Sequence, residues 1–135
     1  MEKIPTLIVV AAALVDGAGR VLLQQRPEGG GMPGLWEFPG GKVEEGEGAE
    51  AALVRELDEE LGIAAEAAAL VPACFASAEL EGRRLILLLF LCRRWQGEPR
   101  PLHASALKWL QPGEMSADEM PPADRPLIDL LAALI

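Results

Sequence analysis

Three glutamates in the stretch RELDEELG, residues 55–62, have the spacing of a metal site. Glu56, Glu59 and Glu60 stand at i, i+3 and i+4, which a helix brings to one side. Their carboxylates repel one another, and they lie at the carboxyl end of that helix, where the dipole favours cations. A solvated acidic face would show the same spacing with its repulsion uncompensated. A divalent cation compensates it, and oxygen ligands of this kind suit Mg²⁺ or Mn²⁺.

A turn upstream of the acidic helix has the composition of a phosphate-binding segment. In EFPGGKVEEGE, residues 37–47, Gly40 and Gly41 precede Lys42. Glycines let the backbone approach a ligand closely, exposed N–H groups can bind phosphate oxygens, and the lysine adds positive charge. Taken alone the segment is an ordinary turn. Its place one loop ahead of the acidic helix predicts that the two form one site.

The composition and net charge of the chain limit which kinds of molecule it can bind. The chain has 135 residues, 50% hydrophobic and 24% charged, which suits a single globular domain over residues 1–135. The net charge of −9 argues against a nucleic-acid polymer as partner, because such binding depends on Lys and Arg. It permits a nucleotide substrate, provided that a divalent cation neutralises both partners.

The sequence shows no export or membrane signal. The apolar run IPTLIVVAAALV, residues 4–15, is too short to cross a bilayer and lacks a strong basic flank, so we interpret it as a buried strand. We therefore expect a cytoplasmic protein that does not contact a membrane. Cys74 and Cys92 stand among apolar residues without CxxC spacing, which predicts buried free thiols.

Strands and helices in mixed order must position these residues. One helix is predicted over residues 48–61 with Gly62 as its stop, and a second over residues 127–134. The turn at 16–19 predicts a hairpin between the first two strands. Such an order predicts an α/β fold whose sheet is covered on both faces. The predicted strands are 4–15, 21–25, 35–38, 70–76, 85–93 and 106–110.

The same residues resemble the Nudix box, G-x5-E-x7-R-E-U-x-E-E-x-G-U, where U is a bulky aliphatic residue. Residues 41–63 meet every fixed position. Around the box, LLQQRP, GLWEFPGGKVE, WQGEP and PPADRPLI resemble the MutT-type branch of this family. The resemblance covers most of the chain and implies the Nudix α/β/α sandwich, with a mixed β-sheet between helices. It also implies hydrolysis of a nucleoside triphosphate to the monophosphate and pyrophosphate.

The resemblance further implies a Mg²⁺ site, with Mn²⁺ as an alternative. Its ligands would be the side chains of Glu56, Glu59, Glu60 and Glu98 and the carbonyl oxygen of Gly40. The implied general base is either Glu56 or Glu98, and the sequence does not rank them.

Five more residues acquire roles from the resemblance. Arg55 and Glu47 match the pair that orients the catalytic helix. Arg26, Phe38 and Asp124 match positions near the nucleoside, and Phe38 is our first choice for stacking on a base. His103 is expected to be an exposed bystander, and the three tryptophans are expected to pack rather than bind.

The sequence does not determine the preferred nucleotide, and Asp124 is the residue that bears on this choice. The MutT-type branch includes 8-oxo-dGTP diphosphatases, which remove oxidised nucleotides from the pool used in DNA replication and repair, and CTP-type pyrophosphohydrolases. The former typically carry PPAN where this chain has PPAD. An ionised aspartate only accepts hydrogen bonds, whereas a protonated one also donates. Asp124 therefore shifts the expectation toward broader or pyrimidine specificity. The first expected substrate is still an oxidised nucleotide such as 8-oxo-dGTP, with CTP, dCTP or a modified pyrimidine triphosphate as the alternative. Asp124 could also be the N-cap of the last helix, and both roles could hold together.

Two other classes of protein are weighed against the enzyme. A Nudix domain that binds nucleotide as a regulator without turnover predicts losses among the box carboxylates, and none is lost. An acidic module that merely binds Ca²⁺ would have no use for the PGGK turn or the PPAD motif. The oligomeric state, monomer or homodimer, stays open.

Overall fold

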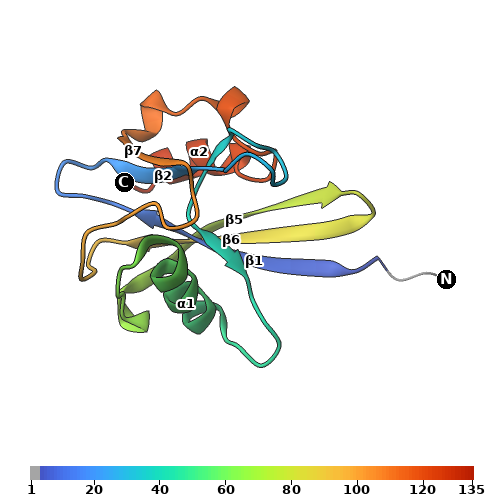
Figure 1. Ribbon diagram of the computed structural model, residues 1–135, viewed down its shortest axis with the longest axis horizontal. Coiled ribbons are helices and arrows are strands. Elements are labelled where there is room, and N and C mark those ends of the chain that lie inside the picture. The colour runs from blue at the N-terminus through green and yellow to red at the C-terminus, as the bar shows by residue number, and fades with distance from the viewer. Residues whose placement is uncertain (1–3) are drawn as a thin grey trace.

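The computed structural model describes residues 4–135, so the first residues of the predicted domain lie outside it. Within these residues, two sheets and two α-helices form the fold (Figure 1). The helices are α1, Ala49–Leu61, and α2, Arg125–Ala132, and short 3₁₀ turns cover Ala67–Ala69, Pro112–Glu114 and Ala117–Glu119. The strands are β1 Thr6–Leu14, β2 Val21–Gln25, β3 Trp36–Glu37, β4 Gly40–Lys42, β5 Leu70–Leu80, β6 Arg83–Cys92 and β7 Ala106–Leu110.

The larger sheet is mixed and has the strand order β4-β1-β6-β5. β1 runs parallel to β6, from the pair Thr6 and Arg84 to the pair Leu14 and Cys92, while β4 and β5 add antiparallel edges. The very apolar segment predicted as a central strand is β6, which has a neighbour on each side. β5 continues to Leu80, beyond the predicted end, because it forms a hairpin with β6.

Both faces of β1 are buried, which explains its continuous apolar sequence. Alternate residues Val10, Ala12 and Leu14 pack on the side of α1, and their neighbours pack on the side of α2. Figure 1 shows the two helices on opposite sides of β1, β5 and β6. The predicted α/β/α sandwich with a mixed sheet is therefore confirmed.

The predicted hairpin between the first two strands is wrong. The turn forms, and Asp16 Oδ1 accepts hydrogen bonds from the backbone N–H of Ala18 at 2.9 Å and of Arg20 at 2.8 Å. Beyond it only Val15 and Val21 bridge. β4 and β6 occupy the two edges of β1, so β2 instead becomes the centre of a second sheet of order β3-β2-β7.

Local chemistry sets the ends of α1 as predicted. The helix starts after Gly48 and stops at Gly62, which adopts a left-handed conformation with φ of 69° and donates its N–H to the Asp58 carbonyl. Gly62 can adopt this φ because it has no Cβ.

Several smaller predictions also meet the structure. Cys92 is a buried free thiol as predicted, while Cys74 is free but only half-buried. His103 is exposed. Trp95 stacks on Trp109 with ring centroids 6.2 Å apart. Within residues 4–135, neither helix has the length and apolar character needed to cross a membrane.

Candidate active site

The acidic face of α1 divides its glutamates between the protein interior and the solvent. Glu60 follows the core residues Leu53 and Leu57 at helical spacing, and it is buried at 7% exposure. The side chain of Glu56 is 15% exposed, whereas that of Glu59 is 52% exposed. The three predicted ligands therefore start from different environments.

Glu60 has a carboxylate that is only half satisfied. Gln24 on β2 donates its Nε2–H to Glu60 Oε1 at 2.6 Å. Within residues 4–135, Glu60 Oε2 has no hydrogen-bond partner. Burial raises the pKa of Glu60 to about 8; the Gln24 hydrogen bond opposes this shift, and the neighbouring Glu56 carboxylate adds to it. A cation at this carboxylate would favour its ionised form.

Arg55 ties the acidic helix to the loop before it. Its Nε and Nη2 donate to the two Glu47 oxygens at 2.8 and 2.9 Å, a bidentate pair. The same guanidinium donates to Glu56 Oε1 at 2.8 Å and to the Lys42 carbonyl at 3.1 Å. The hydrogen bonds from Arg55 lower the pKa of Glu47 to about 2. The two residues predicted as a pair are thus in contact, and Arg55 also holds Glu56 and the β4 backbone.

The two glycines of β4 permit close approaches on opposite sides. A Cβ at Gly41 would overlap the Glu56 carboxylate, and one at Gly40 would overlap the backbone carbonyl of Val10. Gly41 therefore lets the acidic helix approach β4, while Gly40 lets β4 pair with β1.

The acidic residues of the described chain have the oxygen ligands that a divalent cation prefers, but in the structure their side chains do not converge on one point. No three acidic, histidine or cysteine side chains of residues 4–135 converge as a ligand set. Glu59 instead accepts a hydrogen bond from Arg55 Nη1 at 3.3 Å, and Glu98 is exposed. The observation that fits a cation is the buried, unpartnered Glu60 Oε2 beside Glu56, both hard oxygen donors.

Glu98 belongs to a segment that is anchored on the end of α1. Downstream of it, the backbone N–H of Arg100 donates to the Leu61 carbonyl at 2.9 Å. Upstream, Gln96 and Ala64 exchange hydrogen bonds across an isolated bridge. This attachment ties the loop of Glu98 to the carboxyl end of the acidic helix.

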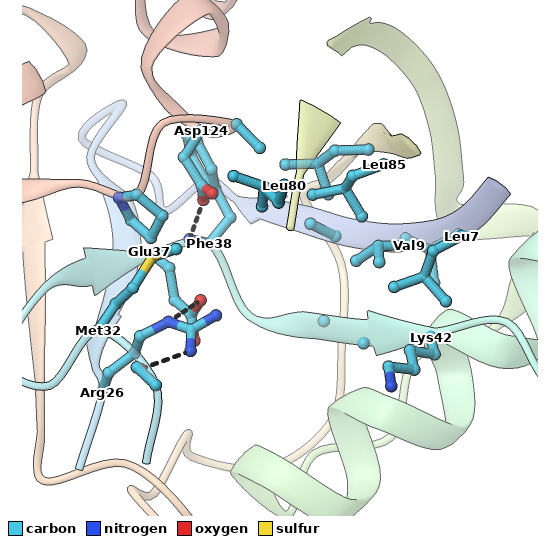
Figure 2. A pocket seen from close by; sticks show the side chains of 18 of the residues that line it. Leu7, Val9, Arg26, Met32, Glu37, Phe38, Lys42, Leu80, Leu85 and Asp124 are labelled. Carbon is cyan, nitrogen blue, oxygen red and sulfur yellow. Dashed lines mark hydrogen bonds and ion pairs between the residues drawn. The ribbon is translucent and has the colours of Figure 1, made fainter. Parts of the chain in front are cut away.

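A cavity of about 510 Å³ lies beside β4 (Figure 2). Arg26, Glu37 and Asp124 form a polar side, and an apolar wall comes from β1, β5 and β6. All the residues predicted to contact substrate line this one cavity: Arg26, Phe38, Gly40, Gly41, Lys42 and Asp124.

Asp124 closes the polar side of the cavity with a buried carboxyl group. It is 6% exposed, and its Oδ2 accepts the backbone N–H of Phe38 at 3.3 Å. Burial, together with the nearby Glu37 charge, raises its pKa to about 7. Asp124 is the N-cap residue of α2, as the alternative interpretation predicted, but its side chain makes no capping hydrogen bond. The side chain is directed to the cavity instead.

Sequence reasoning missed two residues of this region. Glu37 accepts a hydrogen bond from Arg26 Nε at 2.9 Å, and burial raises its pKa. Its position in the EFPGGK segment was a usable signal. Gln24 follows Leu22 by two residues on a strand, so alternation alone places it on the side of α1.

The comparison with known proteins agrees with this fold. A model of the NUDIX domain matches residues 5–131, and the chain belongs to the Nudix family of hydrolases. It is 40% identical over 128 residues to the CTP pyrophosphohydrolase of Escherichia coli (strain K12), covering 95% of this chain and 93% of the relative. It is 37% identical over 116 residues to the 8-oxo-dGTP diphosphatase of the same strain, covering 84% and 87%.

A solved structure shows the same architecture. The crystal structure of the MutT Nudix hydrolase from Burkholderia pseudomallei matches with a TM-score of 0.83 and 30% identity. The match covers 96% of this chain and 99% of that one. The likeness thus extends over nearly the whole of both chains.

Proposed function

We propose that this chain is a Mg²⁺-dependent pyrophosphohydrolase of nucleoside triphosphates, with Mn²⁺ as a substitute, that releases the monophosphate and pyrophosphate. The observation that carries the proposal is the single cavity that reaches from the β4 glycines to Asp124. Next to its Gly41 end stands Glu56, and the opposite side offers the buried carboxyl group of Asp124 beside Arg26 and Glu37. The named activities of the two Escherichia coli relatives support the proposal.

The negative charge of the protein makes a cation part of this function. A triphosphate and a chain of charge −9 repel one another, and Mg²⁺ bound between them would neutralise both and polarise the phosphate oxygens. Glu60 and Glu56 are the inner ligands in this proposal, with the Gly40 carbonyl beside them. Glu59 and Glu98 would join by rotating from their exposed positions.

The residues of the chain then direct one displacement. The oxygen of a water molecule bonds to the β-phosphorus, the bond from that phosphorus to the oxygen bridging to the α-phosphate breaks, and the monophosphate leaves. Glu56 or Glu98 takes the proton of the water. Arg55 fixes Glu56 by a 2.8 Å hydrogen bond, so the Glu56 carboxylate is held in place, whereas the Glu98 side chain is exposed on its anchored loop.

Asp124 bears on which base enters the cavity. With a pKa of about 7, its carboxyl group is divided between a neutral form that donates and accepts and an ionised form that only accepts. The neutral form complements an edge with adjacent donor and acceptor. 8-Oxoguanine offers N7–H beside O6, and cytosine offers its amino group beside N3. We propose an oxidised purine triphosphate such as 8-oxo-dGTP as substrate, with CTP or dCTP as the second candidate because of Asp124.

A substrate panel tests the proposal. Purified protein is incubated with 8-oxo-dGTP, dGTP, CTP and dCTP in Mg²⁺ or in EDTA, and pyrophosphate and orthophosphate are measured separately. Pyrophosphate release from at least one triphosphate, abolished by EDTA, is expected. No turnover of any member would show that the chain is not this enzyme and would favour a nucleotide-binding regulator.

The same assay on Asp124→Asn tests base recognition. The amide is always both donor and acceptor, so the ratio of 8-oxo-dGTP to CTP turnover should rise above that of the natural protein, most clearly above pH 7. An unchanged ratio would mean that Asp124 does not contact the base.

A further inference from the structure

Gln24 has a side-chain amide that is buried in the protein interior, where polar groups normally have all their hydrogen-bond partners. It is 3% exposed, and it lies on the central strand of the smaller sheet, paired with Glu37 on β3 and Leu107 on β7. Its Nε2 donates to Glu60 at 2.6 Å, and within the described chain its Oε1 has no hydrogen-bond partner. Burying an amide with half of its capacity unmet costs stability.

The hydrogen bond between Gln24 and Glu60 has a defined donor and acceptor. In the structure the amide nitrogen faces Glu60, and this is the orientation that an ionised, cation-bound carboxylate requires because it only accepts hydrogen bonds. This bond occupies Oε1 and leaves Oε2 as the free atom of the carboxylate. Because β2 is held by a strand on each side, the amide is presented from a rigid element.

Gln24 and Glu60 share a hollow in the surface. This second hollow has a volume of about 420 Å³ and is also lined by Arg26, Glu37 and His103. Within residues 4–135, two oxygens of this pair are buried without a hydrogen-bond partner, Gln24 Oε1 and Glu60 Oε2. A hydrated divalent cation is one ligand that supplies both needs, since it offers positive charge to the carboxylate and water O–H groups to the amide.

We propose that Gln24 is a positioning residue of the metal site: it holds Glu60 through Oε1 so that Oε2 is the oxygen presented to the cation. The inference rests on the proposed metal-dependent function but concerns a residue outside the Nudix box. Hydrogen-bond partners behind a ligand fix its orientation, and their loss typically weakens metal binding about 10- to 100-fold. Gln24 acts through Glu60 and does not touch the substrate.

The test measures Mn²⁺ binding to the nucleotide-free protein by calorimetry, so it does not depend on turnover. Gln24→Met keeps the length of the side chain and removes the donor, and we expect about 10- to 100-fold weaker binding. The control is Gln25→Met, the next residue on the strand, whose amide donates to the Gly34 carbonyl at 3.2 Å instead. Its Mn²⁺ affinity should equal that of the natural protein.

Each outcome separates the two proposals. If the natural protein binds Mn²⁺ and Gln24→Met binds equally well, Gln24 only satisfies Glu60 structurally, and the inference is overturned while the metal site stands. If the natural protein binds no Mn²⁺, the metal site and the inference both fall. Should Gln24→Met not fold in urea titrations, Gln24→Asn takes its place. Asn keeps the amide but is one methylene too short to reach Glu60, so the same loss is expected and an unchanged affinity would overturn the inference.

Discussion

Asp124 should make the stability of this protein depend on pH in a way that one substitution removes. Its pKa is raised from the ordinary 3.8 to about 7, so the folded state holds this proton over a range where the unfolded chain has lost it. The contribution of the group to stability is therefore most favourable below about pH 3.8 and is lost progressively as the pH rises to about 7.

The size of the effect follows from the shift. The full difference corresponds to about 4 kcal/mol at 1.36 kcal/mol per pKa unit, of which about 2.5 kcal/mol is expressed between pH 5 and pH 8. Asp124→Asn keeps an oxygen to accept the Phe38 N–H but cannot ionise. The free energy of unfolding of the variant, minus that of the natural protein, should thus increase by about 2.5 kcal/mol over this range.

Equilibrium unfolding in urea and EDTA at pH 5, 6, 7 and 8 measures this difference. Glu60 also titrates in this range, but it is common to both proteins and cancels in the subtraction. Asp118→Asn, at an exposed position of a 3₁₀ turn, is the matched control and should give a difference that does not change with pH. A flat difference for Asp124→Asn would refute the claim that burial holds this proton.

Three further predictions concern the acidic helix. Glu59→Gln should abolish Mg²⁺-dependent pyrophosphate release while leaving the free energy of unfolding equal or slightly higher, since one repulsive charge is lost; a normal rate would exclude Glu59 as a ligand. Gly41→Ala should push the Glu56 carboxylate from its position, lowering the unfolding free energy by about 1–3 kcal/mol and weakening Mn²⁺ binding measured by calorimetry. Gly48→Ala is the control and should leave Mn²⁺ binding unchanged, because a Cβ there meets nothing within 4 Å and the φ of −79° suits alanine. Arg55→Met should remove the stability that the lowered pKa of Glu47 contributes above pH 4.5 and that is lost as the pH falls toward 2, so its acid-unfolding profile should be flatter than that of the natural protein over this interval.

Much of the fold follows from local pattern. Gly48 and Gly62 lie directly before and after α1, and the apolar residues between them have helical spacing, so nearby residues alone determine where the helix begins and ends. The burial of β1 and β6 is visible as continuous apolar runs, because a strand covered on both faces has no polar side. The pairing of β2 was not accessible in this way, since it depends on which edges of β1 other strands already occupy.

The candidate site likewise has features that follow from local spacing and features that depend on tertiary packing. Helical spacing by itself determined that Glu56, Glu59 and Glu60 share one side of a helix, and the box spacing related Glu47 to Arg55. Which glutamate is buried was decided by the tertiary structure, because the sheet covers Glu60 and leaves Glu59 in solvent.

The contacts that span the sequence were decided by the tertiary structure alone. Gln24 meets Glu60 across 36 positions, and Asp124 meets Phe38 across 86. A side chain's type limits what it can donate or accept, and the sequence shows that directly. Its protonation and its partner depend on how much water is excluded around it, and that is set by segments distant in the chain that pack over it.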